Sequence, residues 1–254
     1  MNIFKQLDSL LRGQRTTPDS LGGGANGLSA RTFGAASLAL GAAYGAFVGL
    51  FSVIGRPEPN WHQLLASIIK IPLLFLLTLF VTLPSLYVFS ALMGCRLSFH
   101  AVLRLLVATI AVNLALAASL GPILGFFTLS TTSYPFMVVL NVLLLATAGI
   151  VALGFLMRTL RRLDESSITP ESPAPADMNT GINTSPEQPR PEPSSRAVFA
   201  IWIILYGLVG AQMGWILRPF IGNPDLAFQW FRPRTGNFFA SLLHHFGRLF
   251  DLMM

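Results

Sequence analysis

The chain consists of long apolar segments separated by short polar links. A membrane-spanning helix needs about twenty mostly apolar residues, and five segments meet this requirement. They are residues 34–55, 70–94, 101–128, 134–157 and 197–218. The links after the second and third segments are short, so these consecutive helices should be antiparallel neighbours. The pattern predicts an all-α fold, a polytopic transmembrane helical bundle of about five spans.

Polar residues divide the chain into five parts. Residues 1–33 are predicted to form a cytoplasmic lead, and residues 34–163 a four-helix transmembrane block. Residues 164–195 are rich in Pro, Ser and Thr, which is typical of a disordered linker. The fifth span covers residues 196–218, and residues 219–254 form an interfacial tail. The lead and the tail each contain an amphipathic stretch, which predicts interfacial helices near both ends; the lead could also be a loosely ordered terminus.

Acidic residues are distributed very unevenly along the chain. None occurs between Glu58 and Asp164, whereas the linker holds six of the eleven. The chain is 53% hydrophobic and 11% charged, against roughly a quarter charged in soluble domains. These values indicate an integral membrane protein. The missing intramembrane carboxylates argue against proton or cation coupling.

Lysine and arginine near the span ends predict the orientation in the membrane. The lead and the link after the second span carry Lys and Arg residues, and further arginines lie in the linker or beside it, at Arg158, Arg161, Arg162, Arg190 and Arg196. This bias predicts a cytoplasmic amino terminus. Five crossings then place the tail outside the cytoplasm, although the tail is itself basic.

Glycines recur at four-residue spacing in the first and fifth predicted spans. Small residues allow two helix backbones to approach closely, so these positions are candidate helix contacts. They can serve an oligomer interface or the packing of a single bundle. The residues are Gly41, Gly45, Gly49, Gly210 and Gly214.

Two asparagines and two prolines lie inside the apolar spans. Asn113 and Asn141 are polar side chains deep in the spans, while Pro84 and Pro122 each remove a backbone hydrogen bond and can bend a helix. Together they are candidates for a polar solute path. The alternative is that the asparagines bond one helix to another.

The end of the fifth span and the start of the tail are rich in aromatic and basic residues. This composition is typical of a membrane–water interface. We expect contacts with lipid or a partner at Trp215, Arg218, Trp230, Arg232 and Arg234.

No residue pattern indicates catalysis, a cofactor or a metal ion. The single cysteine, Cys95, excludes a disulfide within the chain. His244 and His245 are adjacent, so they would point in different directions on a helix and bind a metal poorly. No phosphate-binding or nucleophile motif occurs. The positive charges sit beside apolar segments, which favours lipid headgroups over nucleic acid.

An apolar helix ending at Gly94 is followed by Leu-Ser-Phe at residues 97–99 and a leucine-rich helix from Ala101. A second helical hairpin then ends in the basic residues 158–162. This stretch, residues 71–160, resembles bacterial members of the Yip1-like integral membrane protein family. The Tyr-x-x-Pro often found in that family's next helix is missing. The tail resembles uncharacterised bacterial membrane proteins. Both resemblances imply a bacterial inner membrane, and neither implies a catalytic residue.

These observations predict a non-enzymatic function. We expect an integral membrane scaffold or accessory subunit that binds lipid and protein partners, either another membrane protein or a second copy of the chain. The alternative is a small-solute permease or channel subunit without proton or cation coupling.

Overall fold

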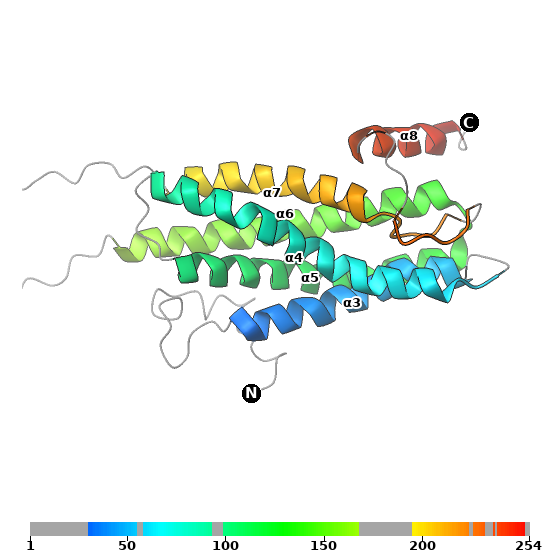
Figure 1. Cartoon of the computed structure of the whole chain (residues 1–254), viewed down its shortest axis with the longest axis horizontal. Helices are drawn as coiled ribbons and strands as arrows, with labels where there is room; N and C mark the ends of the chain where they lie inside the picture. Colours follow the sequence, from blue (N-terminus) through cyan, green and yellow to red (C-terminus); the bar gives the residue numbers. More distant parts are fainter. Residues whose placement is uncertain are drawn as a thin grey trace, which may run out of the picture.

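The computed structural model describes residues 30–54, 58–92, 99–167, 195–223, 226–231, 236 and 238–251. This part of the chain is all-α and contains six helices (Figure 1). They are α3 (Ala30–Ile54), α4 (Trp61–Leu92), α5 (Phe99–Ser130), α6 (Tyr134–Ser167), α7 (Ser195–Leu217) and α8 (Phe238–Asp251). Four of them, α3 to α6, are long and apolar enough to cross a membrane. In α7 the apolar stretch is shorter, over Ile201–Leu217.

Helix α4, the second predicted span, begins earlier than hydropathy predicts. The apolar pattern predicts a link over residues 56–69 and a helix from residue 70, but α4 begins at Trp61. The side chain of Asn60 accepts a hydrogen bond from the Gln63 N–H at 3.1 Å, which is the geometry of an N-cap. The predicted link was therefore wrong over this stretch, because a capping residue rather than the onset of apolarity sets the helix start.

Most of the predicted linker lies outside the described residues. Helix α6 continues to Ser167, beyond the predicted boundary at residue 163, and α7 begins at Ser195. Residues 168–194 and 1–29 are not described. The predicted amphipathic start of the lead belongs to the second range.

Three glycines place α3 directly against α4. A Cβ atom built on Gly45 would lie 2.5 Å from the Ser67 carbonyl oxygen and 2.8 Å from Ile68 Cα. Non-bonded carbon atoms normally pack at roughly 3.5–4.0 Å, so the two backbones are closer here than a larger residue permits. Gly41 and Gly49 make similar approaches to α4. The glycine repeat of α3 therefore packs two helices of one chain together.

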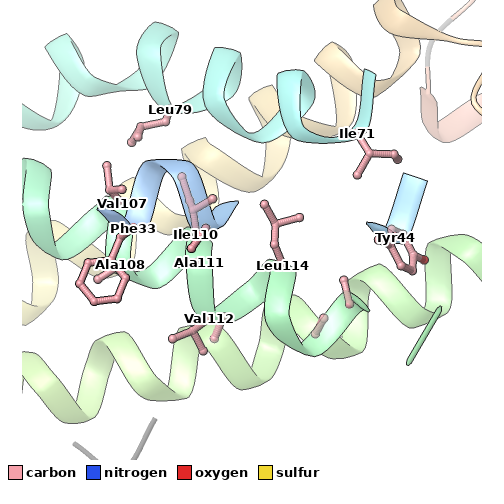
Figure 2. Packing of buried hydrophobic residues seen from close by; sticks show 14 of the residues in the cluster. Phe33, Tyr44, Ile71, Leu79, Val107, Ala108, Ile110, Ala111, Val112 and Leu114 are labelled. Carbon is pink, nitrogen blue, oxygen red and sulfur yellow. The ribbon is translucent and has the colours of Figure 1, made fainter. Parts of the chain in front are cut away.

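Helix α5 supplies much of the buried core. Its residues Val107, Ile110, Ala111 and Leu114 are all buried. Figure 2 shows Ile110 and Leu114 facing the helix α4 that carries Ile71. The core is therefore built around α3, α4 and α5, with α3 packed extensively against both others.

The other two long helices, α6 and α7, pack on different helices of this core. Helix α7 packs mainly on α4, and α6 packs mainly on α5, whereas α6 and α7 approach each other much less. Figure 1 shows α4 crossing the bundle, from beside α3 at one end to beside α7 at the other. The indole N–H of Trp202 donates to the Thr82 carbonyl at 3.1 Å and helps hold α7 on α4. A space is left between α6 and α7.

Helix α8 lies at the end of the bundle where α7 ends (Figure 1). It packs on α6 and, to a lesser extent, on α7. The prediction of a helix in the periodic part of the tail is confirmed, over Phe238–Asp251. This helix therefore covers the adjacent end of the space between α6 and α7.

Candidate functional site

A cavity of about 620 Å³ lies between α6 and α7. Its walls come from α4, α5, α6 and α7, and one end is lined by α8 and the segment after α7. Most lining side chains are apolar, including Leu74, Val142, Leu153 and Ile203. Its volume falls within the range of about 300–1,000 Å³ that is usual for small-molecule sites.

The cavity opens sideways, between the middles of α6 and α7. Only three of its described lining residues are exposed: Ala146 and Ile150 on α6, and Gly207 on α7. Ile150 is 70% exposed. Since these residues lie near the centres of apolar helices, the opening faces the region that lipid chains occupy if the helices cross a membrane.

Two glycines leave room inside the cavity. Gly149 on α6 and Gly207 on α7 both line it, and a Cβ atom built on either would meet nothing within 4 Å. These positions differ from Gly45, where no such room exists. Gly149 and Gly207 therefore widen the cavity rather than join helices.

Aromatic residues close the end of the cavity that is far from α8. Trp202 is buried and its ring lies 5.1 Å from that of Tyr206. The Tyr206 hydroxyl donates to the Phe75 carbonyl at 3.3 Å. Because both polar groups are bonded to the backbone of α4, this end presents mainly apolar ring surface.

The two predicted asparagines lie together on the cavity wall. Asn141 is 8% exposed, and its Oδ1 accepts a hydrogen bond from the Tyr44 hydroxyl at 2.9 Å. Asn113 lines the cavity from α5, and its Oδ1 is buried without a hydrogen-bond partner among the described residues. Asn141 thus bonds one helix to another while also lining the cavity.

The two predicted prolines lie elsewhere. Pro84 in α4 and Pro122 in α5 are exposed on the outside of their helices and do not line the cavity. The structure therefore brings together the asparagines of the predicted polar path but not its prolines.

Polar and aromatic groups gather at the α8 end of the cavity. The Arg218 guanidinium stacks over the Trp215 ring, with 3.5 Å between its Cζ and the ring centroid. The Trp215 indole N–H donates to the Gly236 carbonyl at 3.0 Å. His245 of α8 lines the cavity and packs edge-on against Tyr134 of α6 at 5.7 Å between ring centroids.

The environment of His245 disfavours its charged form. Partial burial, the neighbouring His244 and the cationic Arg248 all lower the pKa of His245 below the ordinary value of 6.5. Its Nδ1 is buried without a hydrogen-bond partner among the described residues. At neutral pH the imidazole is therefore uncharged and suited to packing against the Tyr134 ring.

The segment after α7 is held by a polar stripe on α4. The Gln63 side-chain amide donates to the Pro219 and Phe220 carbonyls at 3.0 and 2.9 Å. Ser67 also donates to the Phe220 carbonyl. Lys70 is only 2% exposed, and its ammonium donates to the Pro219 carbonyl at 3.3 Å and to the Trp230 carbonyl. This stripe fixes the end of α7 beside the start of α4.

Sequence reasoning missed this stripe, although a signal was present. Gln63, Ser67 and Lys70 follow a three-to-four-residue spacing, so they share one helical face. A polar face on an otherwise apolar helix indicates a buried polar partner. The signal was hidden because the helix start was placed at residue 70.

The predicted interfacial belt is only partly described. Trp215 and Arg218 line the cavity, and Trp230 is exposed while its carbonyl accepts from Lys70. Arg232 and Arg234 lie outside the described residues. The predicted glycine contacts at Gly210 and Gly214 are loose, with built Cβ atoms 3.5 and 4.0 Å from Thr78 and Leu74 of α4.

No matching family model, curated protein or solved structure was found in comparisons with known proteins. In the described residues, no group of three or more His, Cys, Asp or Glu side chains is placed to hold a metal ion. The function is therefore argued from the cavity and its polar end.

Proposed function

We propose that this protein is a non-enzymatic integral membrane scaffold or accessory subunit that binds lipid and protein partners. The observation that carries this proposal is the mostly apolar cavity, which opens sideways between the middles of α6 and α7. A cavity with such walls and such an opening suits lipid chains more than a hydrated solute.

The geometry supports this proposal over a permease or channel subunit. A passive path for a polar solute needs polar walls and openings at both membrane surfaces. Here Trp202 and Tyr206 line one end with ring surface, and α8 covers the other. Asn141 is already bonded to Tyr44, so it contributes little to a hydrated path.

A fifth span formed by α7 is part of the proposal. The stripe of Gln63, Ser67 and Lys70 holds the end of α7 beside the start of α4, at the end of the bundle where α3 also ends. Helix α7 therefore runs along the bundle in the direction opposite to α4. With a cytoplasmic amino terminus, a fifth span would put the tail and α8 on the outer side of a bacterial inner membrane, and this orientation is part of the proposal.

Helix α8 offers a surface for a lipid or protein partner. Its apolar residue Leu243 is 75% exposed, and Phe239 is also exposed. Trp230 and Phe231 add exposed rings from the segment that precedes it. A helix of this kind, fixed at the end of a bundle, can lie in the membrane interface or receive a partner.

A paired measurement tests the proposal. The full-length protein would be crosslinked in its native membrane, and the purified protein would be reconstituted in liposomes for solute-flux assays. We expect a stable crosslinked complex, with a second copy or another membrane protein, and no flux above that of empty liposomes. A strictly monomeric protein that passes a small solute would overturn the proposal in favour of the permease.

The resemblance of residues 71–160 to the Yip1-like family stays a prediction. It is compatible with a non-enzymatic membrane function but contributes nothing to the geometric argument.

A further inference from the structure

We infer that the cavity between α6 and α7 binds one acyl chain of an anionic phospholipid, with the phosphate of that lipid at Arg218. This inference rests on the proposed lipid binding and names the class of lipid and the position of its headgroup. The proposed site extends from Arg218, at the end of the cavity that α8 lines, to the lateral opening at Gly207. We call the end at Arg218 the outer end.

The part of the cavity between the lateral opening at Gly207 and Arg218 is about as long as one leaflet of a bilayer is thick. At roughly 1.5 Å per residue, the rise along α7 from Gly207 to Arg218 is about 16 Å. The hydrocarbon core of a bilayer is about 30 Å thick, so this rise is close to half of it. A lipid with its headgroup at Arg218 would therefore have the end of its chain near the opening at Gly207.

The volume suits a small apolar ligand or part of a lipid. The cavity of about 620 Å³ lies within the range of about 300–1,000 Å³ that is usual for small-molecule sites.

The inner walls are suited to a flexible apolar chain. Gly149 and Gly207 leave open space on opposite walls, and branched apolar residues such as Val142 and Leu153 line the remainder. The lateral opening allows a chain to enter from the surrounding lipid without passing through water. No hydrophobic barrier opposes this exchange, because chain and surroundings are equally apolar.

Charge at the outer end favours an anionic headgroup. Arg218 is the only charged side chain among the described lining residues, and no described lining residue is acidic. Its guanidinium is held flat on Trp215, which fixes the plane in which its N–H donors point. A planar guanidinium suits a phosphate group well. Tyr134 and Ser241 line the same end and add hydroxyl groups.

Four variants of the full-length protein test the site. In Gly207→Leu the new side chain would occupy the cavity from α7, and in Gly149→Leu it would occupy it from α6. Gly154→Leu is the matched control, because Gly154 also has nothing within 4 Å of a built Cβ but does not line the cavity. Arg218→Gln removes the charge at the outer end and keeps a polar side chain.

Binding would be measured by native mass spectrometry of the purified protein. The probes are phosphatidylglycerol and phosphatidylcholine with identical acyl chains, titrated into mild detergent. We expect both cavity-filling variants to bind phosphatidylglycerol about tenfold more weakly, because the leucine side chain and the acyl chain would compete for the same space. The Gly154→Leu control should bind as the wild type does.

The headgroup is tested separately from the chain. We expect Arg218→Gln to weaken phosphatidylglycerol binding about fivefold, which is the usual contribution of one cation near an anionic lipid. Its phosphatidylcholine binding should fall less, because the choline cation offsets part of the phosphate charge that Arg218 contacts. Arg248→Gln is the matched control, because Arg248 is exposed on α8 and does not line the cavity.

The outcomes separate this inference from the function on which it rests. If the wild type binds lipid but neither cavity-filling variant loses binding, the cavity is not the site, and the scaffold proposal stands. If Arg218→Gln binds phosphatidylglycerol as tightly as the wild type does, the headgroup assignment is wrong. If the wild type retains neither lipid and conducts a solute in liposomes, the proposed function itself fails. Circular dichroism of each variant identifies any loss of folding.

Discussion

Replacing Gly45 tests the close packing of α3 on α4. A Cβ atom at this position would lie 2.5 Å from the Ser67 carbonyl oxygen and 2.8 Å from Ile68 Cα, and both are backbone atoms that no rotamer change can move. Restoring an ordinary contact of roughly 3.5 Å requires the helices to separate by about 1 Å. Even Gly45→Ala must therefore shift one helix.

The cost of that shift is estimated from overpacking in other proteins. Such substitutions destabilise by about 1–3 kcal/mol. We expect Gly45→Ala to fall in the upper part of this range, because α3 packs along α4 at two further glycines, Gly41 and Gly49, and all three contacts loosen together. Gly154→Ala is the matched control, since a Cβ atom there meets nothing within 4 Å. Its effect should stay within about 1 kcal/mol.

The assay compares the unfolding of the two purified variants in the same detergent. Denaturation followed by circular dichroism measures stability, and size-exclusion chromatography measures the oligomeric state. We expect Gly45→Ala to lose stability without a change in oligomeric state, because its contacts are with α4 of the same chain. A Gly45→Ala protein of wild-type stability that no longer assembles would refute the reasoning, since it would place the glycine repeat at an interface between chains.

Four further predictions concern the tail, the core bond, pH and topology. Replacing Lys70 by Met removes its bonds to the Pro219 and Trp230 carbonyls; we expect about 2 kcal/mol of destabilisation and faster proteolysis of the tail, measured by limited trypsin digestion. Tyr44→Phe removes the hydrogen bond to Asn141 and should cost about 0.6–1.7 kcal/mol in detergent unfolding, with undiminished stability contradicting the bond. Because the pKa of His245 is lowered from 6.5 in the folded protein, packing of α8 on α6 should be intact above that pH and weaken as the pH falls below it; hydrogen exchange of α8 measures this, and the pH dependence should disappear in His245→Phe. Single cysteines at residue 180 and near the carboxyl terminus, in a protein without Cys95, should label from opposite sides of the membrane, and labelling from one side would refute the fifth span.

The boundaries of the helices illustrate how far local signals reach. The apolar segments locate α3 and α5 within a few residues, because an apolar run of that length has few alternatives to a helix. They also locate the start of α6, but α6 continues to Ser167, well beyond the predicted segment end at residue 157. The start of α4 depends on the Asn60 cap, which hydropathy does not detect. Helix α8 was predictable because its polar and apolar residues occupy opposite faces.

The candidate site was much less predictable than the helices. Asn113 and Asn141 stood out as polar residues in apolar helices, and both line the cavity. The remaining walls consist of ordinary apolar residues and glycines, which in sequence look the same as lipid-facing residues. The partners of Lys70 were also hidden, because they are backbone carbonyls far along the chain.

The sequence by itself determined the solvent and the class of this protein. A stretch without carboxylates from Glu58 to Asp164, made largely of apolar residues, is incompatible with a water-facing surface and predicts helices, since the backbone must satisfy its own hydrogen bonds in lipid. Tertiary structure alone decided which glycines join helices and which leave space. The physical reason is that the lipid-facing and protein-facing sides of these helices are both apolar, so only the packing of α7 on α4 and of α6 on α5 creates the cavity between them.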